Sequence, residues 1–117
     1  MPTVKLKRVY EPVAAEDGER VLVDRVWPRG VAKAKLKDAL WLKEIAPSTA
    51  LRQWFGHRAE RWEEFRKRYR AELDANPEAV AKLRALMKHG PVTLLYGARD
   101  TEHNQAVALA EYVKKRR

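Results

Sequence analysis

The stretch of sequence that decides the fold reads Val21-Leu22-Val23-Asp24-Arg25-Val26-Trp27-Pro28-Arg29-Gly30. Its first three residues form an apolar run, which is typical of a central, buried strand. The other seven place a carboxylate, two arginines and an indole in one turn directly after that strand. In open α/β sheets, ligands bind in crevices at the carboxyl ends of the strands. The stretch therefore predicts both an α/β sheet and a binding site at its edge.

The composition indicates one basic domain. The 117 residues are enough for a single domain, 1–117, with a core of its own. Lys and Arg number 25 against 16 Asp and Glu, and the resulting charge of +9 favours anionic partners. There is no cysteine, which excludes disulfides, thiolate catalysis and cysteine-based zinc sites. We expect a cytoplasmic protein with no membrane segment, because no apolar window reaches 18 residues. No cofactor is expected.

The order of the predicted elements is that of an α/β domain. Strands are predicted over residues 4–10, 20–24 and 92–96, and the apolar segment 40–46 slightly favours a further strand over a helix. Only nine residues link the first two strands, which is short for a parallel crossover, so parallel and antiparallel arrangements both stay open. Helices are predicted over 48–55 and 58–74, from Pro77 to just before Gly90, and from about Thr101 onward. The basic stretch 33–38 predicts one helical turn.

The helix over residues 58–74 has the clearest pattern. Trp62, Phe65, Tyr69 and Leu73 recur at spacings of three and four, which places them on one apolar face. We expect this face to be core. The alternative is a partly exposed surface through which two copies of the chain associate, and the sequence leaves the oligomeric state open.

The loop after strand 20–24 holds several candidate site residues. Arg25 and Arg29 lie beside a turn and are suited to bind an anion. Trp27 either stacks on a planar ligand or closes the edge of the core, and the second role is slightly favoured. Asp24 more often serves as a structural acceptor for loop N–H groups in such a position, and it is also a candidate catalytic group.

The loop after strand 92–96 repeats this arrangement. Gly97 allows a ligand to approach the backbone, and Arg99 offers bidentate recognition of phosphate or carboxylate. His103, in the predicted first turn of a helix, is a candidate proton donor or base, and Asn104 is a further ligand-binding candidate. The simpler alternative is that Asp100 or Thr101 only caps the helix. No metal site is predicted, because the three histidines, at 57, 89 and 103, are widely spaced.

Several other blocks accompany the Asp24–Gly30 loop: Arg8-Val9-Tyr10, Trp41-Leu42-Lys43, Ala46-Pro47-Ser48, Trp54-Phe55, Val92-Thr93-Leu94-Leu95-Tyr96 and His103-Asn104-Gln105-Ala106. Together they resemble the YeaO-like proteins, an uncharacterised bacterial and archaeal group within a larger family of unknown function. The resemblance covers nearly the whole chain. It implies a single three-layer α/β/α domain with a small, mainly parallel sheet, and hence parallel strands at 4–10 and 21–24. It implies no activity.

The leading hypothesis is an anion-accepting crevice between loops 24–30 and 97–104, walled by Trp27, Trp41 or His57. Its ligand would be a small phosphorylated or carboxylated molecule, and whether the protein is an enzyme stays open. The second choice is a nucleic-acid-binding module that uses the basic runs 33–37 and 114–117. These runs lack the interleaved aromatic residues of single-strand binders. The third is a homo-oligomeric interaction protein.

Overall fold

The structure, a computed structural model, describes residues 4–115. Residues 1–3 and residues 116–117 of the predicted basic run lie outside the described residues. Within the described part, one sheet contains four strands, β1 (Val4–Arg8), β2 (Glu19–Leu22), β3 (Leu40–Trp41) and β4 (Val92–Tyr96). Their spatial order is β1-β4-β2-β3, and every neighbouring pair is parallel. The predicted α/β class and the parallel sheet are confirmed.

The centre of the sheet is β4. All five of its residues are buried, as their continuous apolar character predicts for a strand that is covered on both faces. β4 pairs with β1 on one side and β2 on the other, with Lys5 opposite Thr93 and Val21 opposite Leu94. β1 and β2 are therefore parallel but not adjacent. The short segment that links them passes over the face of β4.

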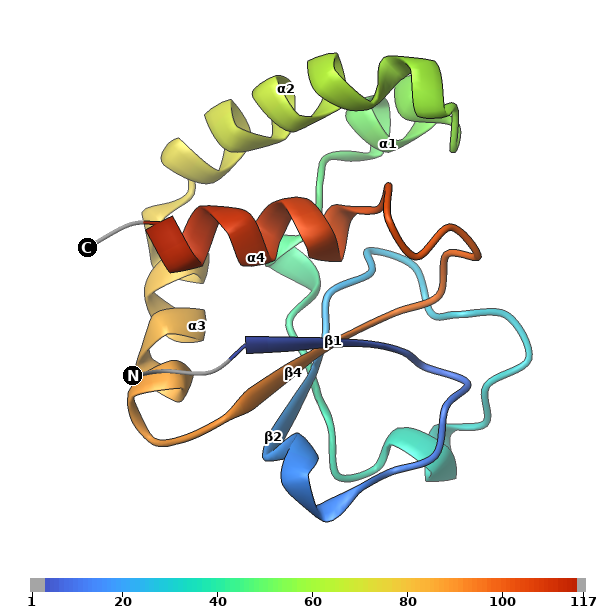
Figure 1. Ribbon diagram of the computed structural model, residues 1–117, viewed down its shortest axis with the longest axis vertical. Coiled ribbons are helices and arrows are strands. Elements are labelled where there is room, and N and C mark those ends of the chain that lie inside the picture. Colours follow the sequence, from blue (N-terminus) through green and yellow to red (C-terminus); the bar gives the residue numbers. More distant parts are fainter. Residues whose placement is uncertain (1–3, 116–117) are drawn as a thin grey trace.

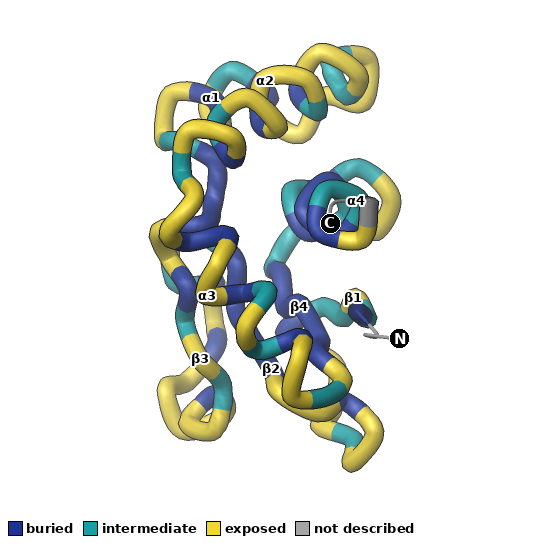
Figure 2. The backbone as a smooth tube through the Cα atoms, turned by 90° about the vertical axis from the view of Figure 1, so that its left-hand side faces the viewer, coloured by how far each residue is buried: buried dark blue, intermediate teal, exposed yellow. Residues whose placement is uncertain are grey.

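The α-helices of the described chain pack into one large core on one face of the sheet (Figure 1). They are α1 (Thr49–Phe55), α2 (Trp62–Asp74), α3 (Pro77–Lys88) and α4 (Gln105–Lys115). The predicted apolar face of α2 is core, since Phe65, Tyr69 and Leu73 are 1–2% exposed and Trp62 is half-buried against them. Figure 2 shows the buried residues of α2 and α4 on their inner sides and exposed residues outside.

Loops and short 3-10 turns cover the opposite face of the sheet. Two of these turns are η1 (Ala15–Asp17) and η2 (Lys33–Leu36), and the second is the helical turn predicted for the basic stretch. They close a smaller core formed by Val9, Leu22, Val31, Leu36 and Leu95. The sheet is thus sandwiched between a layer of α-helices and a layer of irregular structure.

The prediction of a strand over residues 40–46 is wrong beyond Trp41. β3 has two residues, and Lys43–Ile45 forms the 3-10 turn η3. Ile45 turns into the large core, where it is fully buried, and its carbonyl accepts a hydrogen bond from the Tyr69 hydroxyl. A strand at the edge of the sheet ends here because burying Ile45 between the helices requires the chain to leave the sheet.

Four other boundaries differ from the prediction. α2 begins at Trp62 in place of residue 58, since Ala59–Arg61 forms the 3-10 turn η4. β1 ends at Arg8, because the Glu11 carboxylate accepts the Arg8 N–H and the Glu11 N–H donates to the Arg8 carbonyl. β2 covers Glu19–Leu22 in place of residues 20–24. α4 begins at Gln105 in place of Thr101, since the Asn104 side chain accepts the N–H of Val107 and is the N-cap.

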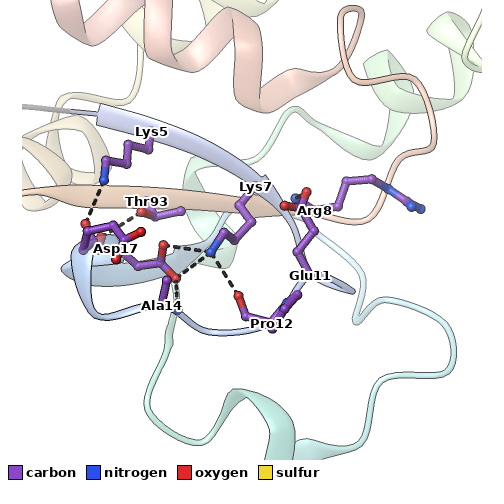
Figure 3. Close-up of polar contacts among 9 residues, drawn as sticks. Lys5, Lys7, Arg8, Glu11, Pro12, Ala14, Asp17 and Thr93 are labelled. Atoms are coloured by element: carbon purple, nitrogen blue, oxygen red, sulfur yellow. Dashed lines mark hydrogen bonds and ion pairs between the residues drawn. The ribbon is translucent and has the colours of Figure 1, made fainter.

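A group of polar contacts holds the link between β1 and β2 (Figure 3). The Lys7 ammonium donates to both carboxylate oxygens of Asp17, at 2.8 and 2.9 Å, and to the Pro12 carbonyl at 3.0 Å. Asp17 also accepts the N–H of Ala14, while its own carbonyl accepts from the Thr93 hydroxyl. The ammonium has three donors, so all of its hydrogen bonds are made within this link.

Gly18 is required where this link joins β2. Its φ is +66°, and a Cβ there would lie 2.2 Å from the carbonyl oxygen of Pro91. Gly18→Ala should therefore lower the free energy of unfolding by at least about 2 kcal/mol, measured by chemical denaturation. Gly30→Ala is the matched control, because φ is +76° there but no atom lies within 4 Å of the added Cβ. Equal losses in the two variants would contradict the close approach at Gly18.

Asp17 should make stability depend on pH. Its hydrogen bonds with Lys7, chiefly, and with the Ala14 N–H hold its pKa below the ordinary value of 3.8. A lowered pKa stabilises the fold above that ordinary value, and the stabilisation is lost as pH falls through the folded pKa. Asp17→Asn should therefore cost about 1–3 kcal/mol at pH 7 and progressively less below pH 4 in urea denaturation. A loss that stays constant down to pH 2 would show that the charge is irrelevant.

Candidate functional site

The loops that follow β2 and β4 meet at the carboxyl edge of the sheet. The Asp24 side chain accepts two hydrogen bonds from the segment that follows β4, one from the Gly97 N–H of the loop at 2.9 Å and one from the Gln105 amide at the start of α4. Because β2 and β4 are parallel neighbours, both loops leave the sheet on the same side (Figure 1). The predicted convergence of the two loops is confirmed.

A cavity of about 510 Å³ opens at this edge, between the two loops and α1. Six of the predicted site residues line it: Asp24, Arg25, Trp27, Arg29, Gly97 and Asn104. Arg99 and His103 are not among its lining residues. His57, predicted as a wall, does line the cavity, whereas Trp41 lies in the smaller core.

Asp24 lies between the cavity and the sheet. Besides its two side-chain contacts, its backbone carbonyl accepts the indole N–H of Trp41 at 2.7 Å. Burial raises the pKa of the Asp24 carboxyl to about 6, although the Gly97 N–H, the Gln105 amide and the charge of Arg52 lower it in part. Near neutral pH this group is mostly ionised, and it gains a proton in mildly acidic solution.

The three arginines of the cavity wall differ in their contacts. Arg25 is half-buried, and it donates to the carbonyls of Pro47 at 2.8 Å and Ala46 at 3.0 Å, which ties the loop to the start of α1. Arg29 and Arg52 are exposed at the mouth. None of the three forms an ion pair with a carboxylate of the described chain. The wall therefore carries three arginines without an ion pair and one carboxylate, Asp24, which is hydrogen-bonded to Gly97 and Gln105.

The loop after β4 does not present His103 to the cavity. The ring Nδ1 of His103 lies 2.9 Å from a carboxylate oxygen of Asp100, and the ring packs edge-on against Trp62, with centroids 5.3 Å apart. Asp100 also accepts the N–H groups of Glu102 and His103, which makes a tight turn before α4. Arg99 is exposed on this turn.

Trp27 and Asn104 have structural contacts as well as a place in the wall. The Trp27 indole donates to the Val31 carbonyl at 2.6 Å and packs edge-to-face on Trp41, with centroids 5.3 Å apart. Both aromatic rings pack against the smaller core, so the predicted role of Trp27 at the core edge is supported. Asn104 is buried, and its side-chain amide donates a hydrogen bond to the Asp100 carbonyl.

The sequence analysis missed Arg52, Gln105 and the aromatic floor formed by Phe55 and Phe65. A signal for the first of these was present. α1 begins directly after the loop that follows β3, so it lies at the same edge of the parallel sheet as the two predicted loops. His57 follows α1 with a φ of 60°, an uncommon conformation for a residue with a side chain, and lines the cavity mouth.

No cluster of three or more His, Cys, Asp or Glu side chains within residues 4–115 is arranged to hold a metal ion. No helix in this part of the chain has the length and apolar character needed to cross a bilayer.

Comparison with known proteins identifies the family. Residues 3–117 match the model of a family described as the inactive DUF488-N3 subclade. The chain is 42% identical to the uncharacterised protein YeaO of Escherichia coli over 111 residues, which cover 95% of this chain and 96% of that protein. It is 41% identical to an uncharacterised protein of Mycobacterium tuberculosis over 113 residues, 97% of this chain and 95% of the relative. No solved structure matches it. The chain therefore belongs to the YeaO-like proteins of unknown function, within the inactive DUF488-N3 subclade.

Proposed function

We propose that the protein binds a small phosphorylated or carboxylated molecule in the cavity between loops 24–30 and 97–104. One observation carries the proposal: Arg25, Arg29 and Arg52 line a single cavity, and none of them is paired with a carboxylate in the described chain. Asp24 is the one carboxylate among the residues that line it. Guanidinium groups recognise phosphate and carboxylate through paired N–H donors.

Two other hollows of the described chain are less suited to an anion. One of about 350 Å³ lies between α2 and α4, where Arg66 is paired with Glu111 at 2.9 Å. Another of about 540 Å³ runs along α3, where the Arg84 guanidinium packs over the Tyr112 ring, 5.7 Å from its centroid. The Asp74 carboxylate lines both. Among these three, the first cavity is the one whose wall has two exposed arginines, Arg29 and Arg52.

Binding without turnover fits the site better than catalysis. Asp24, one of the two candidate catalytic residues, has one carboxylate oxygen held by the Gly97 N–H and the other by the Gln105 amide. His103, the other, is paired with Asp100 outside the cavity wall. The description of the family as inactive agrees with a binding role. In this proposal Asp24 positions the two loops and the arginines supply the affinity, in a cytoplasmic protein.

Nucleic-acid binding is the second candidate. Lys33, Lys35 and Lys37 are exposed on and beside the turn η2, which gives one compact basic segment. Part of the positive charge on the helices is paired, as in Arg68 with Glu64 and Lys82 with Glu44. Association through the aromatic face of α2 has less support, because that face is core.

Replacing the two exposed arginines should remove anion binding. We expect inorganic phosphate, titrated at pH 7.5 in 150 mM NaCl and followed by the amide signals of Gly97 and Ala98, to bind the wild type. In Arg29→Gln/Arg52→Gln its Kd should rise at least about tenfold, because each arginine offers charge-assisted hydrogen bonds. Arg99→Gln is the matched control, since this arginine is exposed on the loop after β4 but does not line the cavity.

Two results would contradict the anion site. One is equal phosphate binding in the wild type and the double variant. The other is DNA binding near 150 mM salt that survives the double change and is lost in Lys33→Gln/Lys35→Gln/Lys37→Gln. Phosphate-backbone binding weakens steeply with salt, so a titration between 50 and 200 mM NaCl separates the two functions further.

Asp24→Asn tests whether burial raises the pKa of the Asp24 carboxyl. A pKa raised from 3.8 to about 6 means that ionising Asp24 costs the folded state free energy as pH rises between these values. Asparagine does not ionise, so the variant lacks this loss of stability. The stability of the variant relative to the wild type should therefore increase from pH 4 to pH 6 and level off above, as measured by urea denaturation. A difference independent of pH would mean that Asp24 has an ordinary pKa.

A further inference from the structure

The cavity is much larger than a bare anion. Its volume is about 510 Å³, within the range of roughly 300–1,000 Å³ that is usual for pockets holding small organic molecules. A water molecule occupies about 30 Å³ in the liquid, and a phosphate ion is only a few times larger. An inorganic ion at the arginines would leave most of the cavity filled with water.

The exposed arginines and the aromatic floor of the wall lie at different depths. The residues of the floor are buried: Phe55 is 5% exposed, Phe65 is 1% exposed, and Pro28 and Pro47 are also buried. The side chains at the mouth include two exposed arginines, Arg29 and Arg52, and the exposed His57. A ligand that contacts both the floor and the arginines at the mouth has its apolar part inward and its anionic group outward.

The floor is aromatic and already packed. The rings of Phe55 and Phe65 are stacked, with centroids 4.4 Å apart and planes at 24°, and Phe65 stacks in turn on Trp62. Trp27 forms part of another wall and is held by its hydrogen bond to Val31. Aromatic walls fixed in this way favour a flat ring, which makes offset or edge-to-face contacts that a puckered ring does not.

Resting on the anion-binding function proposed above, the geometry points to an aromatic phosphate or carboxylate as the ligand. Its ring lies against the floor formed by Phe55 and Phe65, beside Trp27, and its anionic group lies at the mouth with Arg29 and Arg52. The ring supplies the buried apolar contact, and the arginines hold the charge where it stays partly hydrated. Selectivity for a ring with an attached anion thus arises from two separate parts of the wall.

Three probes test this inference by isothermal titration calorimetry at pH 7.5 in 150 mM NaCl: inorganic phosphate, phenyl phosphate and cyclohexyl phosphate. Phenyl phosphate should bind at least about tenfold more tightly than inorganic phosphate, which corresponds to one well-buried apolar group. Cyclohexyl phosphate, of similar size but not planar, should bind several-fold more weakly than phenyl phosphate.

Ala98→Leu separates the ring from the charge. Ala98 lines the cavity and is half-buried, so a longer apolar side chain takes up space that the ring needs. The variant should lose the advantage of phenyl phosphate and keep the affinity for inorganic phosphate. Ala71→Leu, at an exposed position of α2 outside the cavity, is the control. Should Ala98→Leu not fold, NOEs from the phenyl protons to the Ala98 methyl group of the wild type provide the same test.

Each outcome decides one point. Phosphate binding with no gain from the phenyl ring, or equal affinities for the phenyl and cyclohexyl esters, overturns the aromatic ligand and leaves the anion site standing. Absence of binding by all three probes overturns the anion site and the aromatic ligand together. Tight phenyl phosphate binding that Ala98→Leu leaves unchanged, or an absence of NOEs to Ala98, places the ring elsewhere and overturns this inference.

Discussion

The Asp24 side chain joins the two loops on which the rest of the site depends. It follows β2, and it accepts hydrogen bonds from Gly97 and Gln105 in the segment that follows β4. The strands are already fixed side by side by their backbone ladder, but nothing in that ladder determines how their loops lie. At Gly97 a Cβ would lie 3.1 Å from the Asp24 carboxylate, so the glycine permits the close approach. The cavity has its shape because these loops are held together.

The arginines of the cavity wall serve two different purposes. Arg25 donates hydrogen bonds to the carbonyls of Pro47 and Ala46, and so positions α1 against the loop. Arg29, four residues later, is exposed at the mouth, as is Arg52 on the helix that Arg25 positions. One arginine builds the wall, and the other two leave their charge available to a ligand.

Much of the architecture was predictable from local patterns. The apolar runs at 21–23 and 92–96 identified the central strands, and the spacing from Trp62 to Leu73 identified the buried face of α2. The carboxyl ends of these two strands, followed by Asp24 and Gly97, indicated where the cavity lies. Other features depended on contacts that these patterns do not specify. Asn104 lines the cavity and also caps α4, and His103 pairs with Asp100 outside the cavity wall. The place of Arg52 follows from the sheet topology, which brings α1, after β3, to the same edge as the two loops, and not from a local pattern.

The most direct test of the anion site is a crystal structure of the protein soaked with tungstate, an anion with the tetrahedral shape of phosphate and a strong anomalous signal. The account predicts an anomalous peak at the mouth of the cavity, within hydrogen-bonding distance of the guanidinium groups of Arg29 and Arg52. Peaks only at the basic turn Lys33–Leu36, or only at contacts between molecules in the crystal, would contradict it.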